Sequence, residues 1–146
     1  MPALLSWLAT LAAGLFAGAA IYVSLVEHPA RVSLGGSVAV QQFRPSYRRG
    51  AAMQAPLALL GAAASLAHWA LGGSPAWGIG GLALGALVPF TLVVIMPTNT
   101  RLLDARLDVS GDDAAALLQR WARLHAVRSA VGLAVFALFT ALLVRR

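Results

Sequence analysis

Four long apolar stretches, separated by polar segments, dominate the hydropathy pattern of the chain. Each stretch has about the 20 residues that a helix needs to cross a bilayer core of about 30 Å. Because backbone groups in lipid must form hydrogen bonds within their own segment, each stretch predicts a transmembrane helix. The expected spans are Leu4–Val26, Gly50–Leu71, Trp77–Met96 and Ala126–Val144.

The polar segment before the fourth stretch has a helical signal of its own. Ser110-Gly111-Asp112-Asp113 predicts a capping box with Ser110 as the N-cap residue, followed by an alanine- and leucine-rich run. A helix starting there would continue without a break into the fourth span. We therefore expect an all-α fold with a single domain over residues 1–146, an integral membrane four-helix bundle with a cytoplasmic helical extension before the fourth span.

Composition supports a membrane protein and removes several other classes. The 146 residues are 60% hydrophobic and only 11% charged, whereas a soluble domain has about a quarter charged residues. The net charge of +6 comes from arginines beside the apolar stretches, so we expect no nucleic-acid binding. Cysteine is absent, which excludes disulfides, thiolate metal sites and redox chemistry that needs a cysteine pair.

The arginines are divided unevenly between the connections. Two connections carry four each, and these are Arg31, Arg44, Arg48, Arg49, Arg101, Arg106, Arg120 and Arg123. The middle turn carries none and the C-terminus two. The positive-inside rule predicts a multi-pass protein of the plasma membrane, with both long loops in the cytoplasm and both termini outside. Trp7, Trp69 and Trp77 would then lie at the outer interface, which tryptophan prefers.

Two pairs of glycines predict close helix packing. Gly14 and Gly18 in the first span, and Gly81 and Gly85 in the third, form the small-xxx-small pattern that lets helix backbones approach in lipid. We expect these pairs to pack helices within the bundle. An interface between copies in a homo-oligomer is the alternative.

Polar side chains gather at the predicted cytoplasmic ends of the spans. Ionisable groups kept at membrane depth usually face the bundle interior or a wet cavity. Four helix ends that converge there predict a pocket with apolar walls and a polar mouth, the usual form of a ligand site. The side chains concerned are Glu27, His28, Tyr47, Gln54, Asn99, Trp121, His125 and Arg128.

Trp121, His125 and Arg128 are spaced i, i+4 and i+7, so they share one face of a helix. An indole, an imidazole and a guanidinium on one face suit an aromatic or anionic ligand, and His125 could move a proton near neutral pH. The alternative is an interfacial belt, in which the indole lies among lipid headgroups and the guanidinium reaches the phosphates.

A metal site is a minor alternative. Glu27, His28 and His125 would supply two histidines and one carboxylate, the ligand set of non-haem iron. No spacing supports such a site, because the ligands would come from separate helices. We therefore expect no cofactor, and an ion pair between Glu27 and either Arg128 or one of the loop arginines.

Several local elements resemble the anthrone oxygenase-like membrane proteins, in the same order on four spans and over nearly the whole chain. They are Glu27-His28-Pro29, Phe43 to Tyr47, Met96-Pro97-Thr98-Asn99 with Leu102, and Trp121 with His125 and Arg128. The resemblance implies oxidation of anthrones to anthraquinones by molecular oxygen, without a known cofactor. The site residues that it implies are His28, Asn99, Trp121, His125 and Arg128.

Two hypotheses follow. The first is a membrane-embedded oxygenase that acts on a hydrophobic, anthrone- or quinone-like molecule at the cytoplasmic helix ends, with the lipid bilayer and molecular oxygen as its other partners. Its catalytic residues would be His28, His125, Arg128 and Asn99, and its substrate-binding residues Trp121, Glu27, Tyr47 and Gln54. The second is a non-catalytic membrane module that binds lipid, assists assembly or accompanies a transporter.

Overall fold

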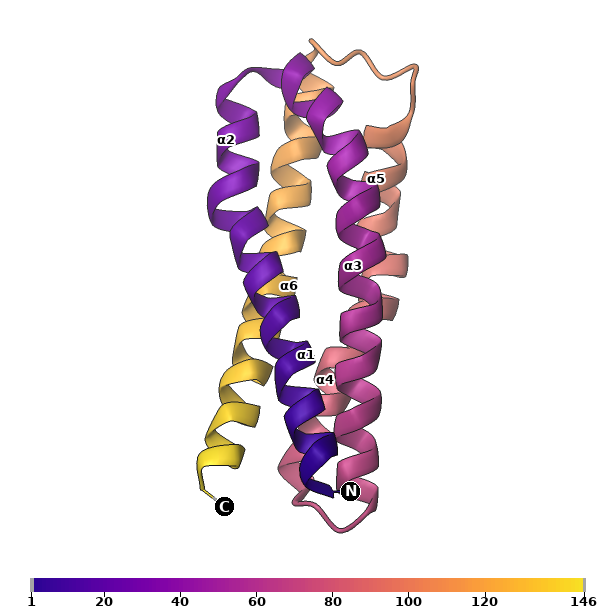
Figure 1. The fold of residues 1–146 in the computed structure, drawn as a ribbon. Helices are drawn as coiled ribbons and strands as arrows, with labels where there is room; N and C mark the ends of the chain where they lie inside the picture. Colours follow the sequence, from indigo (N-terminus) through magenta and orange to yellow (C-terminus); the bar gives the residue numbers. More distant parts are fainter. Residues whose placement is uncertain (1, 146) are drawn as a thin grey trace.

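The computed structural model describes residues 2–145, which contain helices and turns and no strand (Figure 1). Two of the helices each include a short π-helical segment, labelled η. In chain order the elements are α1 (Pro2–Tyr22), η1 (Val23–Glu27), α2 (His28–Ser33), α3 (Gly36–Ala70), α4 (Pro75–Phe90), η2 (Thr91–Ile95), α5 (Met96–Leu103) and α6 (Asp112–Val144).

Within residues 2–145, these elements join into four helices that are long and apolar enough to cross a membrane: Pro2–Ser33, Gly36–Ala70, Pro75–Leu103 and Asp112–Val144. The expected all-α, membrane-type four-helix bundle is therefore confirmed. All four helices extend well beyond the expected spans at the arginine-rich end. The helical extension before the fourth span is also confirmed, because α6 begins at Asp112 and continues into the apolar stretch.

The expected capping box is wrong. The N-cap residue of α6 is Gly111, and no side chain caps this helix end. Ser110 is used instead to close the preceding turn, because its hydroxyl donates to Asp108 Oδ1 at 2.7 Å and its backbone N–H donates to the same oxygen at 3.0 Å. Asp112 and Asp113 still stabilise the first turn of α6, since their negative charges lie at the positive end of the helix dipole.

The two ends of the bundle differ in their packing. Both termini and the turn between α3 and α4 lie at one end, and the α2–α3 and α5–α6 connections lie at the other (Figure 1). The terminal end has a solid core in which Trp77 and Phe139 stack with ring centroids 4.7 Å apart. Trp7 and Trp69 are 65% and 44% exposed, as an interfacial residue would be. Trp77 is only 2% exposed, so its indole packs inside the bundle at this end. The interfacial position of the three tryptophans stays a prediction.

The glycine pairs mostly pack helices within the bundle. A Cβ atom at Gly81 would lie 3.2 Å from the backbone oxygen of Ala62, and one at Gly14 would lie 2.8 Å from the ring of Phe136. Gly18 differs, since a Cβ atom there would meet nothing within 4 Å. The packing prediction therefore holds for the third span and for Gly14. The homo-oligomer stays a prediction.

The two π segments interrupt α-helical geometry in the half of the bundle that is away from the termini. After each segment, the next backbone N–H bonds to the carbonyl five residues back instead of four. A proline, Pro29 or Pro97, follows one residue later and has no N–H to offer. Each segment thus inserts one extra residue and changes the direction of the side chains that follow. Such insertions occur frequently at functional sites.

Candidate functional site

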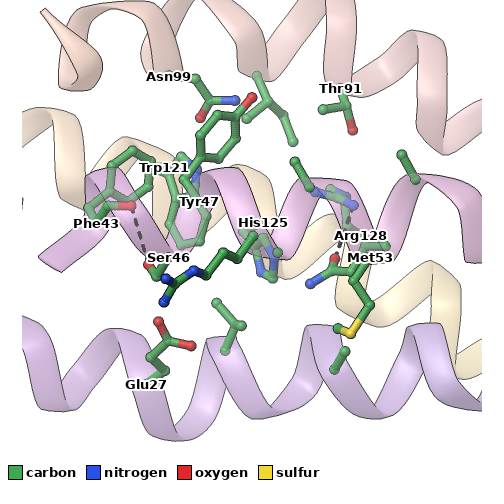
Figure 2. A pocket seen from close by; sticks show the side chains of 18 of the residues that line it. Glu27, Phe43, Ser46, Tyr47, Met53, Thr91, Asn99, Trp121, His125 and Arg128 are labelled. Atoms are coloured by element: carbon green, nitrogen blue, oxygen red, sulfur yellow. Dashed lines mark hydrogen bonds between the residues drawn. The ribbon is translucent and has the colours of Figure 1, made fainter.

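A cavity of about 590 Å³ lies among η1, α3, η2 and α6. It follows α3 from Gln42 to Ala58, which is roughly 24 Å at the α-helical rise. Most of the surface that lines it is apolar, and its walls include Leu87 and Val88. Figure 2 shows the polar side chains that project between the helices. A cavity of this size and character suits a small organic molecule.

The cavity opens through the side of the bundle. Tyr22, Met53 and Leu92 line it and are also 56%, 51% and 58% exposed. These half-exposed apolar side chains belong to the helices that are long enough to cross a membrane. A hydrophobic molecule dissolved in a surrounding bilayer could therefore reach the cavity directly.

Seven of the eight site residues expected from the sequence line this one cavity: Glu27, Tyr47, Gln54, Asn99, Trp121, His125 and Arg128. The eighth, His28, lines a separate groove between α2 and α6. Both histidines contact the indole of Trp121, with ring centroids 5.2 Å away for His28 and 4.6 Å away for His125. The roles of these residues stay predictions, and the geometry gives His125 direct contact with the cavity.

Glu27 forms its ion pair with Arg31, so the expectation of a loop-arginine partner is confirmed and Arg128 is not that partner. Gln42 also donates to the same carboxylate oxygen at 3.0 Å. Arg31 is only 4% exposed, and its guanidinium lies 5.8 Å from the ring of Trp121. From the sequence, Arg31 was expected only as a loop charge, although its i, i+4 spacing from Glu27 was a signal for this pair.

Asn99 carries a buried amide without a partner. Its side chain is fully buried, and neither its amide nitrogen nor its amide oxygen has a hydrogen-bond partner in residues 2–145. A buried amide left in this way is destabilising by about 1–3 kcal/mol, so most native structures satisfy such groups. Asn99 is among the residues that line the cavity (Figure 2), so its amide lies beside the space that a ligand would occupy.

Arg128 brings a positive charge into the apolar part of the cavity. Its Nη2 donates to the side-chain oxygen of Gln54 at 3.1 Å, and its Nε is buried without a partner in the described residues. Across the described part of the chain, Arg128 forms no ion pair with a carboxylate. Since a charge in an apolar site is costly unless it is paired, this arrangement favours a ligand that carries or develops negative charge.

His125 is in hydrogen-bond contact with a pair of serines that were not among the site residues expected from the sequence. Ser24 Oγ lies 3.0 Å from His125 Nδ1 and 2.8 Å from Ser129 Oγ. His125 and Ser129 are 3% and 8% exposed. The spacing of Ser129 four residues after His125 was a weak signal, because serines in transmembrane helices often bond only to their own helix. Ser24 had no signal, since only folding brings η1 beside α6.

The three side chains of the metal alternative do not come together as ligands. In residues 2–145, no three histidine or acidic side chains are grouped so that they could hold a metal ion. Glu27 is engaged by Arg31 and Gln42, while His28 faces the other groove. Cofactor content stays a prediction.

The fold and the cavity define a small, membrane-type four-helix bundle with a laterally open candidate site. A family model described as anthrone oxygenase matches residues 43–138, about two thirds of the chain. The chain therefore belongs to the anthrone oxygenase family. The matched range contains Tyr47, Gln54, Asn99, Trp121, His125 and Arg128, and begins after Glu27 and His28. No curated protein and no solved structure matches this chain.

Proposed function

We propose that the cavity binds a hydrophobic aromatic molecule of the anthrone or quinone type and that the chain oxidises it with molecular oxygen. The observation that carries the proposal is the unpartnered hydrogen-bonding capacity of Asn99 and Arg128, which line the same apolar cavity as His125. Family membership supports the reaction class. An apolar cavity also suits an oily substrate and keeps competing water away.

The reaction can be written with residues of this chain alone. His125 removes a proton from the CH₂ carbon of the anthrone, and the electron pair moves toward the ring carbonyl oxygen. Asn99 and Arg128 donate to the oxyanion that develops there. The carbanion and oxygen form a carbon–oxygen bond, and the proton from His125 completes a hydroperoxide. Loss of water from the hydroperoxide gives the new carbonyl, so one oxygen molecule yields one anthraquinone and one water.

The remaining residues are assigned to binding. The flat indole of Trp121 offers a stacking surface for an aromatic ring system. Tyr47, Gln54 and the Glu27 ion pair give the cavity polar groups that orient the substrate. His28 is the second candidate base, and it would act only if the substrate passed beyond the indole that it contacts.

We also propose that the chain is a multi-pass protein of the plasma membrane with its arginine-rich end in the cytoplasm. The uneven arginine distribution supports this orientation. Because the chain has no cysteine, single cysteines can report it. In intact cells, a membrane-impermeant maleimide should label Ser74→Cys, in the exposed turn between α3 and α4, and should not label Ser110→Cys. The reverse pattern would overturn the orientation.

Oxygen uptake by purified protein tests the reaction. The protein in lipid nanodiscs should consume oxygen and form anthraquinone from anthrone above the rate of the protein-free control. His125→Ala and Arg128→Gln should each lower turnover by roughly 100-fold or more. Thr140→Ala is the control, because within residues 2–145 that exposed hydroxyl bonds only to the carbonyl of Phe136 in its own helix.

Two outcomes would contradict the proposal. Turnover that survives both His125→Ala and His28→Ala would remove the assigned bases. Binding of anthrone without oxygen uptake above the control would favour the non-catalytic module instead.

A further inference from the structure

A chain of three hydrogen bonds connects His125 to the backbone of the first helix. His125 Nδ1 lies 3.0 Å from Ser24 Oγ, which lies 2.8 Å from Ser129 Oγ. Ser129 Oγ in turn lies 3.0 Å from the carbonyl oxygen of Ala20 and 3.3 Å from that of His125. The chain thus runs from an imidazole through two hydroxyls to carbonyl oxygens.

The backbone carbonyl of Ala20 determines which group donates in each of these three hydrogen bonds. A carbonyl oxygen only accepts, so Ser129 must donate its single hydroxyl proton to it. Ser129 Oγ therefore accepts the proton of Ser24. Ser24 has then used its own proton, and its contact with His125 is a hydrogen bond only if Nδ1 carries a hydrogen and donates. All three bonds are satisfied by one tautomer of the imidazole.

The opposite direction is unfavourable. If Ser24 donated to an unprotonated Nδ1, Ser129 would have to donate to Ser24. The oxygen of Ser129 would then face the carbonyl oxygen of Ala20 at 3.0 Å with no proton between them. Two buried oxygens at that distance repel one another, and the desolvation of an unsatisfied group adds to the cost.

We infer that Ser24 and Ser129 are positioning residues that hold neutral His125 with its proton on Nδ1, so that Nε2 is left unprotonated for a ligand in the cavity. His125 can then accept a proton at Nε2 without any hydroxyl turning, because Nδ1 donates to Ser24 in both the neutral and the protonated imidazole. The assignment of the tautomer does not depend on the proposed function. Only the use of His125 as a catalytic base rests on the proposed function.

Nitrogen-15 NMR of histidine-labelled protein in nanodiscs tests the tautomer directly. The chain has only three histidines, and the loss of one signal in His125→Gln assigns this residue. Spectra are taken at mildly alkaline pH, where imidazoles are neutral. We expect a protonated Nδ1 and an unprotonated Nε2 in His125. A protonated Nε2 in the wild-type protein would overturn the inference, whether or not the protein oxidises anthrones.

Variants of the serines separate positioning from simple packing. Ser24→Ala and Ser129→Ala should move His125 toward the other tautomer, while Ser24→Thr keeps the hydroxyl and should keep the wild-type spectrum. Ser33→Ala is the matched control, since in the described part of the protein that exposed hydroxyl bonds only to the carbonyl of Ala30. An unchanged His125 spectrum in Ser24→Ala would also overturn the inference.

If the proposed function holds, Ser24→Ala should lower kcat about tenfold with little change in KM, because part of the protein would present a protonated Nε2 that cannot act as the base. A normal kcat together with the expected NMR change would keep the tautomer and remove only its catalytic importance.

Discussion

Gln54 on α3 and Arg128 on α6 are joined by a hydrogen bond of 3.1 Å between the amide oxygen and Nη2. The acceptor is therefore a neutral amide where a carboxylate of nearly the same shape would fit. In an apolar cavity, this choice leaves the positive charge of Arg128 available to a ligand.

Gln54→Glu should stabilise the protein and weaken ligand binding. The new carboxylate would pair with Arg128, so the melting temperature should rise. An anionic hydroxyanthraquinone probe should then lose its charge-assisted hydrogen bond to Arg128, which is worth about 1.5–3 kcal/mol. Its affinity should fall roughly ten- to hundredfold. Thermal unfolding and fluorescence titration measure the two effects. Unchanged affinity in a stabilised variant would show that Arg128 does not bind the probe.

Met53→Trp should hinder access from the side of the bundle. Met53 lines the cavity and is half-exposed, so an indole at this position would obstruct the opening. We expect a severalfold higher KM for a hydrophobic substrate with kcat nearly unchanged. Leu60→Trp is the control on the same helix, since Leu60 is 45% exposed and does not line the cavity. Equal kinetic constants in the two variants would contradict a lateral opening.

Gly80→Ala should destabilise the solid end of the bundle. The added Cβ atom would lie 2.3 Å from the ring of Phe139, which is fully buried and stacked on Trp77. Overpacking of this kind costs about 1–3 kcal/mol. Gly18→Ala meets nothing within 4 Å and should gain up to about 1 kcal/mol of helix propensity. Thermal unfolding in detergent should give a melting temperature below that of the wild type for Gly80→Ala and above it for Gly18→Ala.

The turn after α5 should loosen in acid. Hydrogen bonds from the backbone N–H and the side chain of Arg106 lower the pKa of Asp104 below its ordinary value of 3.8. Its carboxylate therefore stabilises the turn above that ordinary value, and the stabilisation is lost as pH falls through the lowered pKa. Amide hydrogen exchange at Arg106, corrected for intrinsic rates, should accelerate as the pH falls through that lowered pKa. Asp104→Asn should remove this acid step, and a persistent step would assign it elsewhere.

The sequence predicted the elements of the fold better than their ends. Apolar length alone indicated four spanning helices, and α6 begins with the expected extension. The helix boundaries were less accurate because polar stretches such as residues 36–49 continue α3 beyond the apolar stretch. The capping box at Ser110 failed for a local reason, since Asp108 competes successfully for the serine hydroxyl.

The candidate site was predictable where it depended on spacing within one helix. Trp121, His125 and Arg128 share a face of α6 and line the same cavity. Adjacent Glu27 and His28 face different cavities, because η1 and α2 keep both residues in helical geometry. Contacts between helices, above all that of Ser24 with His125, depend on the π segment and could not be obtained from a one-dimensional pattern.

The bundle is solidly packed at the end that holds the termini and contains the cavity in its other half. This difference determines from which side of a membrane a molecule could enter the cavity. In a spanning orientation, the stacked rings of Trp77 and Phe139 seal the bundle axis at one surface. A guest molecule could exchange only with the monolayer beside the hollow half. The protein would then serve a single leaflet, drawing its guest from that leaflet and returning it there, and would not form a conduit between the two sides.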